Sequence, residues 1–419
     1  MAAPTVSPRS LTPARPRRLW LRPAAVAIPI YLAACVAPDG GLLRAARFRD
    51  VHLYQGFANA VFDGHVPYRD FFMEYPPAAI PAFVVPAAGG TGERGYFHRF
   101  QALLLLLAGL TIVASGILLA RASSLRLYGT SVVIGAAPAL LGPTFFARYD
   151  LWPAALVALA LVALARGRDL LGVALLAVGT AAKVYPAVIV PLAIVYVWKR
   201  AGARGAAIAA GLFCAVAGAI MLPFAALGLG GLGYSFYTQT TRALEFESLG
   251  GALLLAAHKL GLYHAGIVDQ LSFNLVGTTP KVLGALLTVA EILLLLCVWF
   301  WFARSRAGVD ELLLAAAAAV TVFVAFGKVL SPQYLIWLVP LVPLAAGRFG
   351  ALASGLLVAA LLLTQGWFPR RFHDAVSLGD SDWLIVARDG VLVALAGLLL
   401  FALRRLSAQP SRAARSEAT

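Results

Sequence analysis

The chain has 419 residues, of which 61% are hydrophobic and 13% are charged, and its mean hydropathy is +0.84. A soluble domain has roughly 45–50% apolar and 25% charged residues, so this composition excludes an ordinary soluble protein and predicts a polytopic membrane protein. The net charge of +15 does not indicate a nucleic-acid partner, because no soluble segment is long enough to gather the Lys and Arg residues on one face.

The N-terminal residues 1–23 form a basic tail that resembles the start of a signal peptide. The apolar run that follows has spanning length and no convincing cleavage site, so we expect a cytoplasmic tail and a retained first helix. Crossing a bilayer takes roughly 17–25 apolar residues, or fewer where a helix is broken inside a bundle. About twelve segments meet this criterion: 24–40, 98–120, 129–146, 151–166, 169–183, 186–199, 205–228, 278–303, 309–327, 333–347, 350–365 and 383–405.

The distribution of charge assigns the two sides of the membrane. The tails and the short basic turns hold about 19 of the 34 Lys and Arg residues but only about 4 of the 19 Asp and Glu residues. Because positive residues are enriched on the cytoplasmic side, this side is predicted to be cytoplasmic and to contain both termini.

The polar loops on the other side are long, at residues 41–97, 229–277 and 366–382. Because binding and catalytic residues are often carried by loops, long loops on one face indicate that the protein functions on that face. The transmembrane domain is expected over residues 24–405, followed by a disordered cytoplasmic tail, 406–419. In the first loop, PPAAIPAFVVPAAGG is too short and too rich in proline to span comfortably, so we expect an interfacial or re-entrant helix there.

Acidic residues in the first loop are the first candidates for catalysis. Asp50 follows the first predicted helix at the level of the membrane surface, between Arg49 and His52. A partly desolvated carboxylate at this place could accept a proton from a hydroxyl. The alternative for any one of these acids is a solvated loop residue, and Asp63, which precedes a glycine, fits that alternative better.

Charged residues also lie where predicted helices end or break. Arg148 and Asp150 lie at the outer end of a helix, where they could pair with each other, or Arg148 could bind a phosphate. Lys183 and Lys328 each precede a proline break. Because a lysine at the bilayer centre costs roughly 2.5–3.5 kcal/mol on insertion scales, each is either an interfacial residue beside a break or the partner of an anion.

The second predicted loop mixes aromatic, amide and charged side chains. The stretch YSFYTQTTRALEFES contains Gln239, Arg242, Glu245 and Glu247 near two tyrosines. Such rings and polar groups suit the apolar faces and the hydroxyl groups of a sugar. An interfacial aromatic belt has the same composition and remains the alternative.

Cysteine and histidine patterns point to no disulfide framework and no zinc site. The three cysteines, Cys35, Cys214 and Cys297, each lie in an apolar run, and the six histidines show no HExxH or paired spacing. The sequence therefore predicts neither a metal nor another cofactor.

Five stretches, taken in order, resemble the bacterial polyprenol-phosphate-mannose-dependent mannosyltransferases of glycosyltransferase family 87, within the GT-C superfamily. They are GHVPYRDFFMEYPP (64–77), RYDLWPAALVALAL (148–161), AAKVYPAVIVP (181–191), RALEFESLGG (242–251) and GKVLSPQYLIWLVPL (327–341). The resemblance covers most of the chain, and the last part matches by hydropathy alone.

This resemblance implies an all-α integral membrane protein, a GT-C-type polytopic bundle of about twelve transmembrane helices with the interfacial helix in its first extracytoplasmic loop. It implies inverting transfer of a hexose, with mannose expected, from a polyprenyl-phosphate-linked sugar donor to a hydroxyl of a cell-envelope glycolipid or glycan acceptor. The active site is expected on the extracytoplasmic face, with membrane lipids around the protein and no metal or cofactor in the reaction.

The resemblance also guides the choice of site residues. Asp50 takes the position of the catalytic base, with Asp70 or Glu74 as alternatives. Positive charge is needed opposite the departing phosphate, and the candidates are Arg148, Lys183, Arg242 and Lys328. The other predicted substrate-binding residues, with Glu74 and Gln333 positioning sugar hydroxyls, are Asp70, Glu74, Tyr75, Asp150, Glu247 and Gln333.

Two other functions compete with a transferase. A transporter or flippase of a lipid-linked sugar would also have about twelve helices with broken spans, but it predicts loops of similar size on both faces. A binding protein or scaffold for a sugar lipid would tolerate loss of the Asp50 carboxylate.

Overall fold

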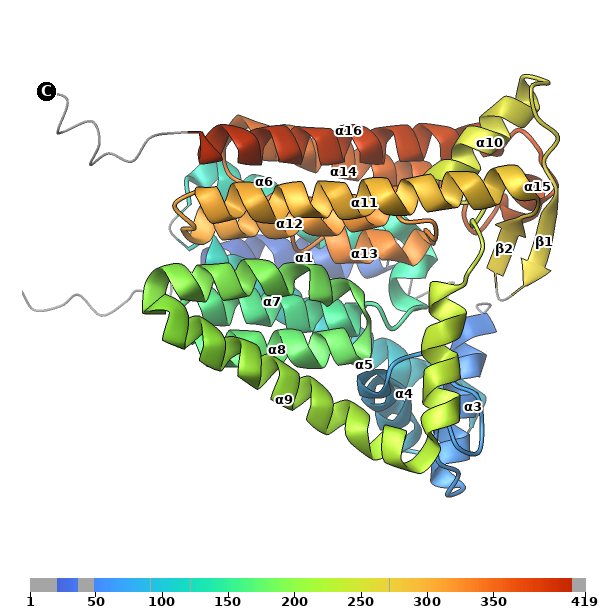
Figure 1. The fold of residues 1–419 in the computed structure, drawn as a ribbon, viewed down its shortest axis with the longest axis horizontal. Coiled ribbons are helices and arrows are strands. Elements are labelled where there is room, and N and C mark those ends of the chain that lie inside the picture. Colours follow the sequence, from blue (N-terminus) through green and yellow to red (C-terminus); the bar gives the residue numbers. More distant parts are fainter. Residues whose placement is uncertain (1–20, 37–48, 91, 121, 271, 409–419) are drawn as a thin grey trace, which may run out of the picture.

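The computed structural model describes residues 21–36, 49–90, 92–120, 122–270 and 272–408 (Figure 1). It is 79% helical, and seven of its helices are long and apolar enough to cross a membrane. This confirms the predicted all-α polytopic membrane class. The predicted tails, 1–23 and 406–419, lie mostly outside the described residues.

Most helices run along one common axis and form the bundle in Figure 1. Packing pairs within it are α1 with α6, α7 with α8, and α14 with α16. The members and their bounds are α1 (Leu21–Val36), α5 (Glu93–Leu118), α6 (Ser124–Leu141), α7 (Leu151–Ala165), α8 (Asp169–Ala182), α11 (Thr278–Arg304), α12 (Val309–Phe326), α14 (Gly347–Trp367) and α16 (Asp382–Ser407).

Proline-containing breaks divide the shorter bundle segments, and of these the breaks that follow Lys183 and Lys328 were predicted from the sequence. The 3-10 turn η3 (Gly142–Phe146) lies between α6 and α7, and η4 (Tyr185–Ile189) follows α8. The predicted segment 333–347 is a broken element made of η5 (Pro332–Tyr334), α13 (Leu335–Leu338) and η6 (Val342–Leu344). Proline removes a backbone donor and clashes with the preceding turn, so continuous helices are not formed here.

Two predicted spans belong to one bent element, α9 (Val190–Thr240). Non-helical backbone angles at Gly202 and Gly228 divide it into three arms. The first two arms correspond to the predicted segments 186–199 and 205–228. Its most apolar stretch has no buried residues, which is the expected state of a helix whose side chains face lipid.

The predicted long loops contain regular structure, which is a difference from the sequence analysis. The first loop forms α3 (Arg49–Phe62), η2 (Pro77–Ala79) and α4 (Ile80–Ala87). The second contains the last arm of α9, α10 (Leu249–Lys259) and the antiparallel hairpin of β1 (Ile267–Gln270) and β2 (Ser272–Leu275). The third contains α15 (Phe372–Val376). A helix does exist where PPAAIPAFVVPAAGG predicts one.

These extra elements lie together at one end of the bundle. Figure 1 shows α3, the last arm of α9, α10, the hairpin and α15 at the end opposite the last residues of α16. Tertiary packing of a buried face stabilises such short elements in spite of their weak sequence pattern.

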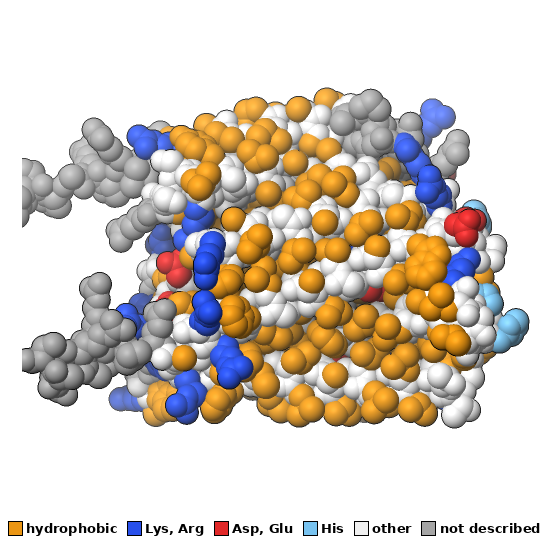
Figure 2. All heavy atoms as spheres, turned by 90° about the horizontal axis from the view of Figure 1, so that it is seen from above, with side chains coloured by type: hydrophobic (Ala, Val, Ile, Leu, Met, Phe, Trp, Pro, Cys, Tyr) orange, Lys and Arg blue, Asp and Glu red, His pale blue; other side chains and the backbone are white. Residues whose placement is uncertain are grey.

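The opposite end carries the short turns and a concentration of positive charge. The Arg126 guanidinium pairs with Asp310 at 3.0 Å, and Arg200 pairs with Asp169 at 3.0 Å. Each ion pair joins two helices next to the turns at this end. Figure 2 shows a row of Lys and Arg side chains at this end, fewer of them at the other end beside acidic and histidine side chains, and an apolar surface along the middle of the molecule. The charge asymmetry predicted from the sequence is therefore an asymmetry between the two ends of the bundle.

Candidate active site

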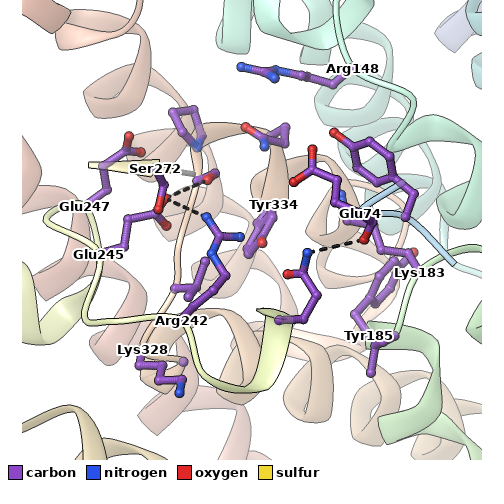
Figure 3. Close-up of a pocket in the computed structure, with 18 of the residues that line it drawn as sticks. Glu74, Arg148, Lys183, Tyr185, Arg242, Glu245, Glu247, Ser272, Lys328 and Tyr334 are labelled. Carbon is purple, nitrogen blue, oxygen red and sulfur yellow. Dashed lines mark hydrogen bonds and ion pairs between the residues drawn. The ribbon is translucent and has the colours of Figure 1, made fainter. Parts of the chain in front are cut away.

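A cavity of about 620 Å³ lies at the end of the bundle that carries the extra elements (Figure 3). Its wall combines the segment after α3, the breaks that follow α8 and α12, the last arm of α9, and parts of β2 and α11. Helix breaks and loops thus supply most of its polar groups. A cavity of this size can hold a sugar and a phosphate group.

The structure brings most of the predicted site residues to this cavity. Its lining includes Asp50, Glu74, Tyr75, Arg148, Lys183, Arg242, Glu247, Lys328 and Gln333. Asp70 and Asp150 are not part of the lining. These positions extend over more than 280 residues of sequence, so the fold alone brings them together.

Asp50 lies in the first turn of α3 and forms an ion pair with Arg148. An acid in the first helical turn is stabilised by the helix dipole, and the guanidinium favours its ionised form. An ionised carboxylate at the edge of the cavity is in the correct state to accept a proton. The Asp50 side chain is about a quarter exposed, so a ligand in the cavity can reach it.

Asp150 pairs with Lys183 on the same side of the cavity. The Lys183 ammonium lies 2.6 Å from Asp150 Oδ1, and Trp337 donates its indole N–H to the same oxygen at 2.7 Å. Asp150 is buried behind the cavity wall, whereas Lys183 lines the cavity. The ammonium of Lys183 is thus largely buried beside an acidic partner.

Arg242 and Lys328 lie on the other side of the cavity. Arg242 approaches Glu245 at 3.5 Å, a long contact, and Lys328 donates to the backbone carbonyl of Thr240 at 2.7 Å. Burial and the positive charge of Arg242 lower the pKa of Lys328. Two cations held close together in this way are prepared for an anionic ligand.

The loop after α9 places two buried acids beside these cations. Burial raises the pKa of Glu245, and burial together with the neighbouring charge of Glu245 raises the pKa of Glu247 well above its usual value. Arg388 of α16 is fully buried and donates to the backbone carbonyl of Glu247 at 2.5 Å. Arg388 also pairs with Asp389 at 2.7 Å.

Figure 3 shows how these groups face one another. Glu245, Glu247 and Arg242 lie on one side of the view, and Glu74 and Lys183 lie on the other, with Tyr334 between them. The cavity is therefore bordered by both acids and cations at each end.

The loop that carries Glu74 and Tyr75 is fixed against the last arm of α9. Tyr68 has a left-handed backbone conformation, with φ of 68°, and donates its hydroxyl to the carbonyl of Tyr75 at 2.5 Å. Its own backbone lies against Gly228 and Gly231, where a Cβ atom at Gly231 would lie 1.7 Å from the Tyr68 carbonyl oxygen. Only glycine permits this approach, so α9 positions the loop.

Asp70 forms hydrogen bonds within this loop and is not part of the cavity lining. It accepts from Arg69 at 2.8 Å and from the backbone N–H of Val66 at 2.7 Å. The Arg69 hydrogen bond, followed by that from Val66, holds the pKa of Asp70 at about 2. A carboxyl group with so low a pKa is a weak base, and Glu74 is the first-loop alternative to Asp50 that lines the cavity.

Several buried hydrogen-bonding atoms on the cavity wall have no partner within the described chain. They belong to the side chains of Tyr185 (OH), Arg242 (Nε), Glu245 (Oε2), Glu247 (Oε2) and Gln333 (Oε1). Buried polar atoms in native proteins are almost always hydrogen-bonded. Their collection around one cavity indicates a ligand that is rich in hydrogen-bonding groups.

Some site residues were not predicted from the sequence. Trp337 and Tyr334 lie in an aromatic stretch that is indistinguishable in sequence from an interfacial belt. Glu291 lines the cavity from α11, and a signal existed for it, because it is an isolated acid inside an apolar span. The same signal marks Arg388 and Asp389 in α16.

Within the described residues, no group of three or more His, Cys, Asp or Glu side chains has the arrangement of a metal site. The positive charge that borders the cavity comes from Arg and Lys side chains.

Comparison with known proteins identifies a family match and a partial match to a bacterial membrane protein. Residues 149–378, more than half of the chain, match the family described as mannosyltransferase (PIG-M). A stretch of 112 residues is 37% identical to a UPF0060 membrane protein from Serratia proteamaculans (strain 568), over 27% of this chain and 82% of that protein. The family match includes Asp150, Lys183, Arg242, Glu247 and Lys328 and begins just after Arg148. The chain therefore belongs to the mannosyltransferase (PIG-M) family, a GT-C-type family of membrane glycosyltransferases.

Proposed function

We propose that this protein transfers mannose from a polyprenyl-phosphate donor to a hydroxyl of a cell-envelope glycolipid or glycan, with inversion at the sugar carbon. The main support for this proposal is the cavity at the end of the bundle. Its lining contains the carboxylate of Asp50 in an ion pair, several cations, and residues with unpartnered hydrogen-bonding atoms. The family supports mannose as the sugar. The likeness of five sequence stretches to family 87 supports the polyprenyl-phosphate donor.

The chemistry requires a base on one side of the sugar and positive charge on the other. Asp50 takes the proton of the acceptor hydroxyl as that oxygen bonds to the anomeric carbon. The bond from this carbon to the phosphate oxygen breaks, and the polyprenyl phosphate leaves with the electron pair. Arg148 is paired with Asp50 on the base side, and the other cations that border the cavity, Lys183, Arg242 and Lys328, are the candidates for stabilising the negative charge of the leaving group.

Polar groups of the wall hold the sugar during this step. Gln333 Oε1 and Glu247 Oε2 have no partner within the described chain and can accept hydrogen bonds from sugar hydroxyls. Glu74 lies across the cavity from Glu247 (Figure 3), and Tyr75 lines the cavity next to Glu74 in the chain. Hydrogen bonds that only a correctly placed sugar can form give both orientation and selectivity.

We further propose that the cavity faces the extracytoplasmic side and that both termini are cytoplasmic. Two observations support this orientation: the gathering of Lys and Arg at the end opposite the cavity (Figure 2), and the enrichment of positive residues in cytoplasmic loops of membrane proteins. A lipid-linked donor in the outer leaflet would then reach the cavity from the bilayer.

Radiolabelled donors test this function directly. Membranes that contain the protein are incubated with polyprenyl-phosphate mannose and, in parallel, with the glucose and arabinose equivalents, and the labelled products are identified. We expect mannose to move from its lipid to a new glycolipid or glycan. A transporter or flippase would instead move the intact donor across the membrane. Failure of the protein to release sugar from any donor, while donor crosses the membrane, would reject the transferase.

A further inference from the structure

The four cations of the cavity are not equivalent in their surroundings. Lys183 has a close carboxylate partner in Asp150 at 2.6 Å. Lys328 donates to the carbonyl of Thr240 and forms no ion pair with any residue that the structure describes. The Arg242 contact with Glu245 is long, at 3.5 Å, and its Nε atom has no partner within the described chain.

Aromatic rings enclose the Lys183 ammonium. Its nitrogen lies 4.8 Å from the centre of the Tyr149 ring, 5.3 Å from that of Tyr334 and 5.1 Å from that of Trp337. Each ring face attracts the cation and restricts the directions from which water can reach it. Lys183 thus has one ionic partner and three aromatic neighbours, which hold its nitrogen at one point on the wall.

Trp337 is itself locked in place. It is stacked between Tyr185, at a ring separation of 4.2 Å, and Tyr334, at 4.1 Å. Its indole N–H is donated to Asp150 at 2.7 Å. The ring stack fixes the orientation of the N–H, the N–H fixes Asp150, and Asp150 fixes Lys183.

We propose that Lys183, held by Asp150 and Trp337, donates a hydrogen bond to a hydroxyl of the transferred sugar, and that the donor phosphate lies at the other end of the cavity against Arg242 and Lys328. This assignment rests on the proposed function and divides its cavity into a sugar end and a phosphate end. Trp337 and Asp150 are positioning residues.

The charged groups at the two ends of the cavity explain why we place the sugar at one end and the phosphate at the other. The ammonium of Lys183 is neutralised by Asp150, and Glu74 lies on the same side of the cavity (Figure 3). A phosphate at this end would compete with Asp150 for Lys183, whereas a neutral hydroxyl would not. Glu245 and Glu247 border the other end, but the contact of Arg242 with Glu245 is long and burial raises the pKa of both acids. The ammonium has three N–H donors, of which the Asp150 bond uses one. At the other end, two neighbouring cations can pair with a phosphate without first breaking a short ion pair.

Two ligands allow binding at the sugar end and binding at the phosphate end to be measured separately. Polyprenyl phosphate carries the phosphate without the sugar, and its inhibition constant reports the phosphate end. The KM of polyprenyl-phosphate mannose reports both ends. We expect Lys183→Met to raise KM and lower kcat/KM by at least about tenfold, because a hydrogen bond from a charged group is lost, while the inhibition constant of polyprenyl phosphate stays within about twofold.

Lys328→Met is the matched control, since it removes the same kind of charge from the other end. We expect it to raise both the KM of the donor and the inhibition constant of polyprenyl phosphate. Retained binding of polyprenyl phosphate by Lys183→Met also shows that this variant is folded.

The positioning residues have their own test. Trp337→Phe removes the indole N–H, and we expect a higher KM for the mannosyl donor with an unchanged inhibition constant for polyprenyl phosphate. Asp150→Asn removes the negative charge. The ammonium of Lys183 is then no longer held at one point on the wall, so we expect a higher KM for the mannosyl donor and an unchanged inhibition constant for polyprenyl phosphate.

The outcomes distinguish this inference from the function on which it rests. If the wild-type protein cleaves no polyprenyl-phosphate sugar, the proposed function fails. If the wild type is active and Lys183→Met weakens polyprenyl phosphate as strongly as Lys328→Met does, the transferase stands and the division of the cavity is wrong. An unchanged KM for the mannosyl donor in Lys183→Met would also overturn the inference.

Discussion

At the scale of single residues, the site combines charges that the sequence identifies with partners that it does not. Lys183 and Asp50 stand out in the sequence because each is a charge beside a break or at the end of an apolar segment. The pairing of these charges does not stand out, since Asp150 is 33 residues from Lys183 and 187 residues from Trp337. Pairing over such separations is decided by helix packing, so most of the residues predicted from the sequence line the cavity, but few of their contacts were predicted.

Removal of an unpartnered hydroxyl should affect activity without loss of stability. Tyr185 lines the cavity, and its buried hydroxyl has no partner within the described chain. We expect Tyr185→Phe to leave the thermal unfolding temperature unchanged or raised, because an unsatisfied buried group is removed. If this hydroxyl bonds the sugar, kcat/KM should fall by roughly three- to tenfold, which corresponds to one neutral hydrogen bond.

Thr144→Val is the control for this variant. The Thr144 hydroxyl is also buried without a partner in the described chain, but it lies outside the cavity lining. The two variants should therefore agree in thermal unfolding and differ in transfer rate. Equal activity in both would show that the Tyr185 hydroxyl does not contact the substrate.

At the scale of helices and loops, glycines decide where α9 bends and what it contacts. Gly202 and Gly228 mark its bends, and the predicted spans end close to both, so composition located these boundaries. Of the helices inside the long loops, the one in PPAAIPAFVVPAAGG was predicted, whereas α3 was not, because it is amphipathic but too polar to be recognised as a span; it packs on α4 and α5. The contact of Gly231 with Tyr68 joins residues that no local pattern relates.

A methyl group at Gly231 should displace the loop that carries Glu74. A Cβ atom there would lie 1.7 Å from the Tyr68 carbonyl oxygen, so Gly231→Ala forces the backbone apart. We expect a loss of stability of about 1–3 kcal/mol, as for other overpacked sites, with a clear drop in transfer activity. Thermal unfolding in detergent and donor turnover measure the two effects.

Gly230→Ala is the neighbouring control, because nothing lies within 4 Å of the position of its Cβ atom. Alanine is the better helix former, so this variant should be as stable as the wild type or slightly more stable. If Gly231→Ala behaved in the same way, the loop would not depend on this contact.

At the scale of the whole molecule, the two ends of the bundle differ in charge and in structure. One end has the basic turns (Figure 2), and the other has the extra elements (Figure 1) and the cavity. The sequence predicted this asymmetry because charge and loop length are visible without a structure. It could not predict the cavity, whose wall comes from segments that meet only when the whole bundle is packed.

Labelling of single cysteines should reveal the orientation. In a background without Cys35, Cys214 and Cys297, His65→Cys lies in an exposed turn of the cavity end, and Arg166→Cys lies in an exposed turn of the basic end. A membrane-impermeant maleimide added to intact cells should label the first variant and reach the second only after permeabilisation. The reverse pattern would contradict an extracytoplasmic cavity.

The central claim is that the carboxylate of Asp50 acts on an acceptor hydroxyl within the cavity while mannose leaves its lipid phosphate. Single-turnover cleavage of labelled polyprenyl-phosphate mannose by the purified wild type and by Asp50→Asn, with donor binding measured in parallel, tests it most directly. We predict that the amide variant binds the donor and transfers mannose roughly 10²- to 10⁴-fold more slowly, the usual contribution of a general base. A variant that turns over at the wild-type rate would contradict the account.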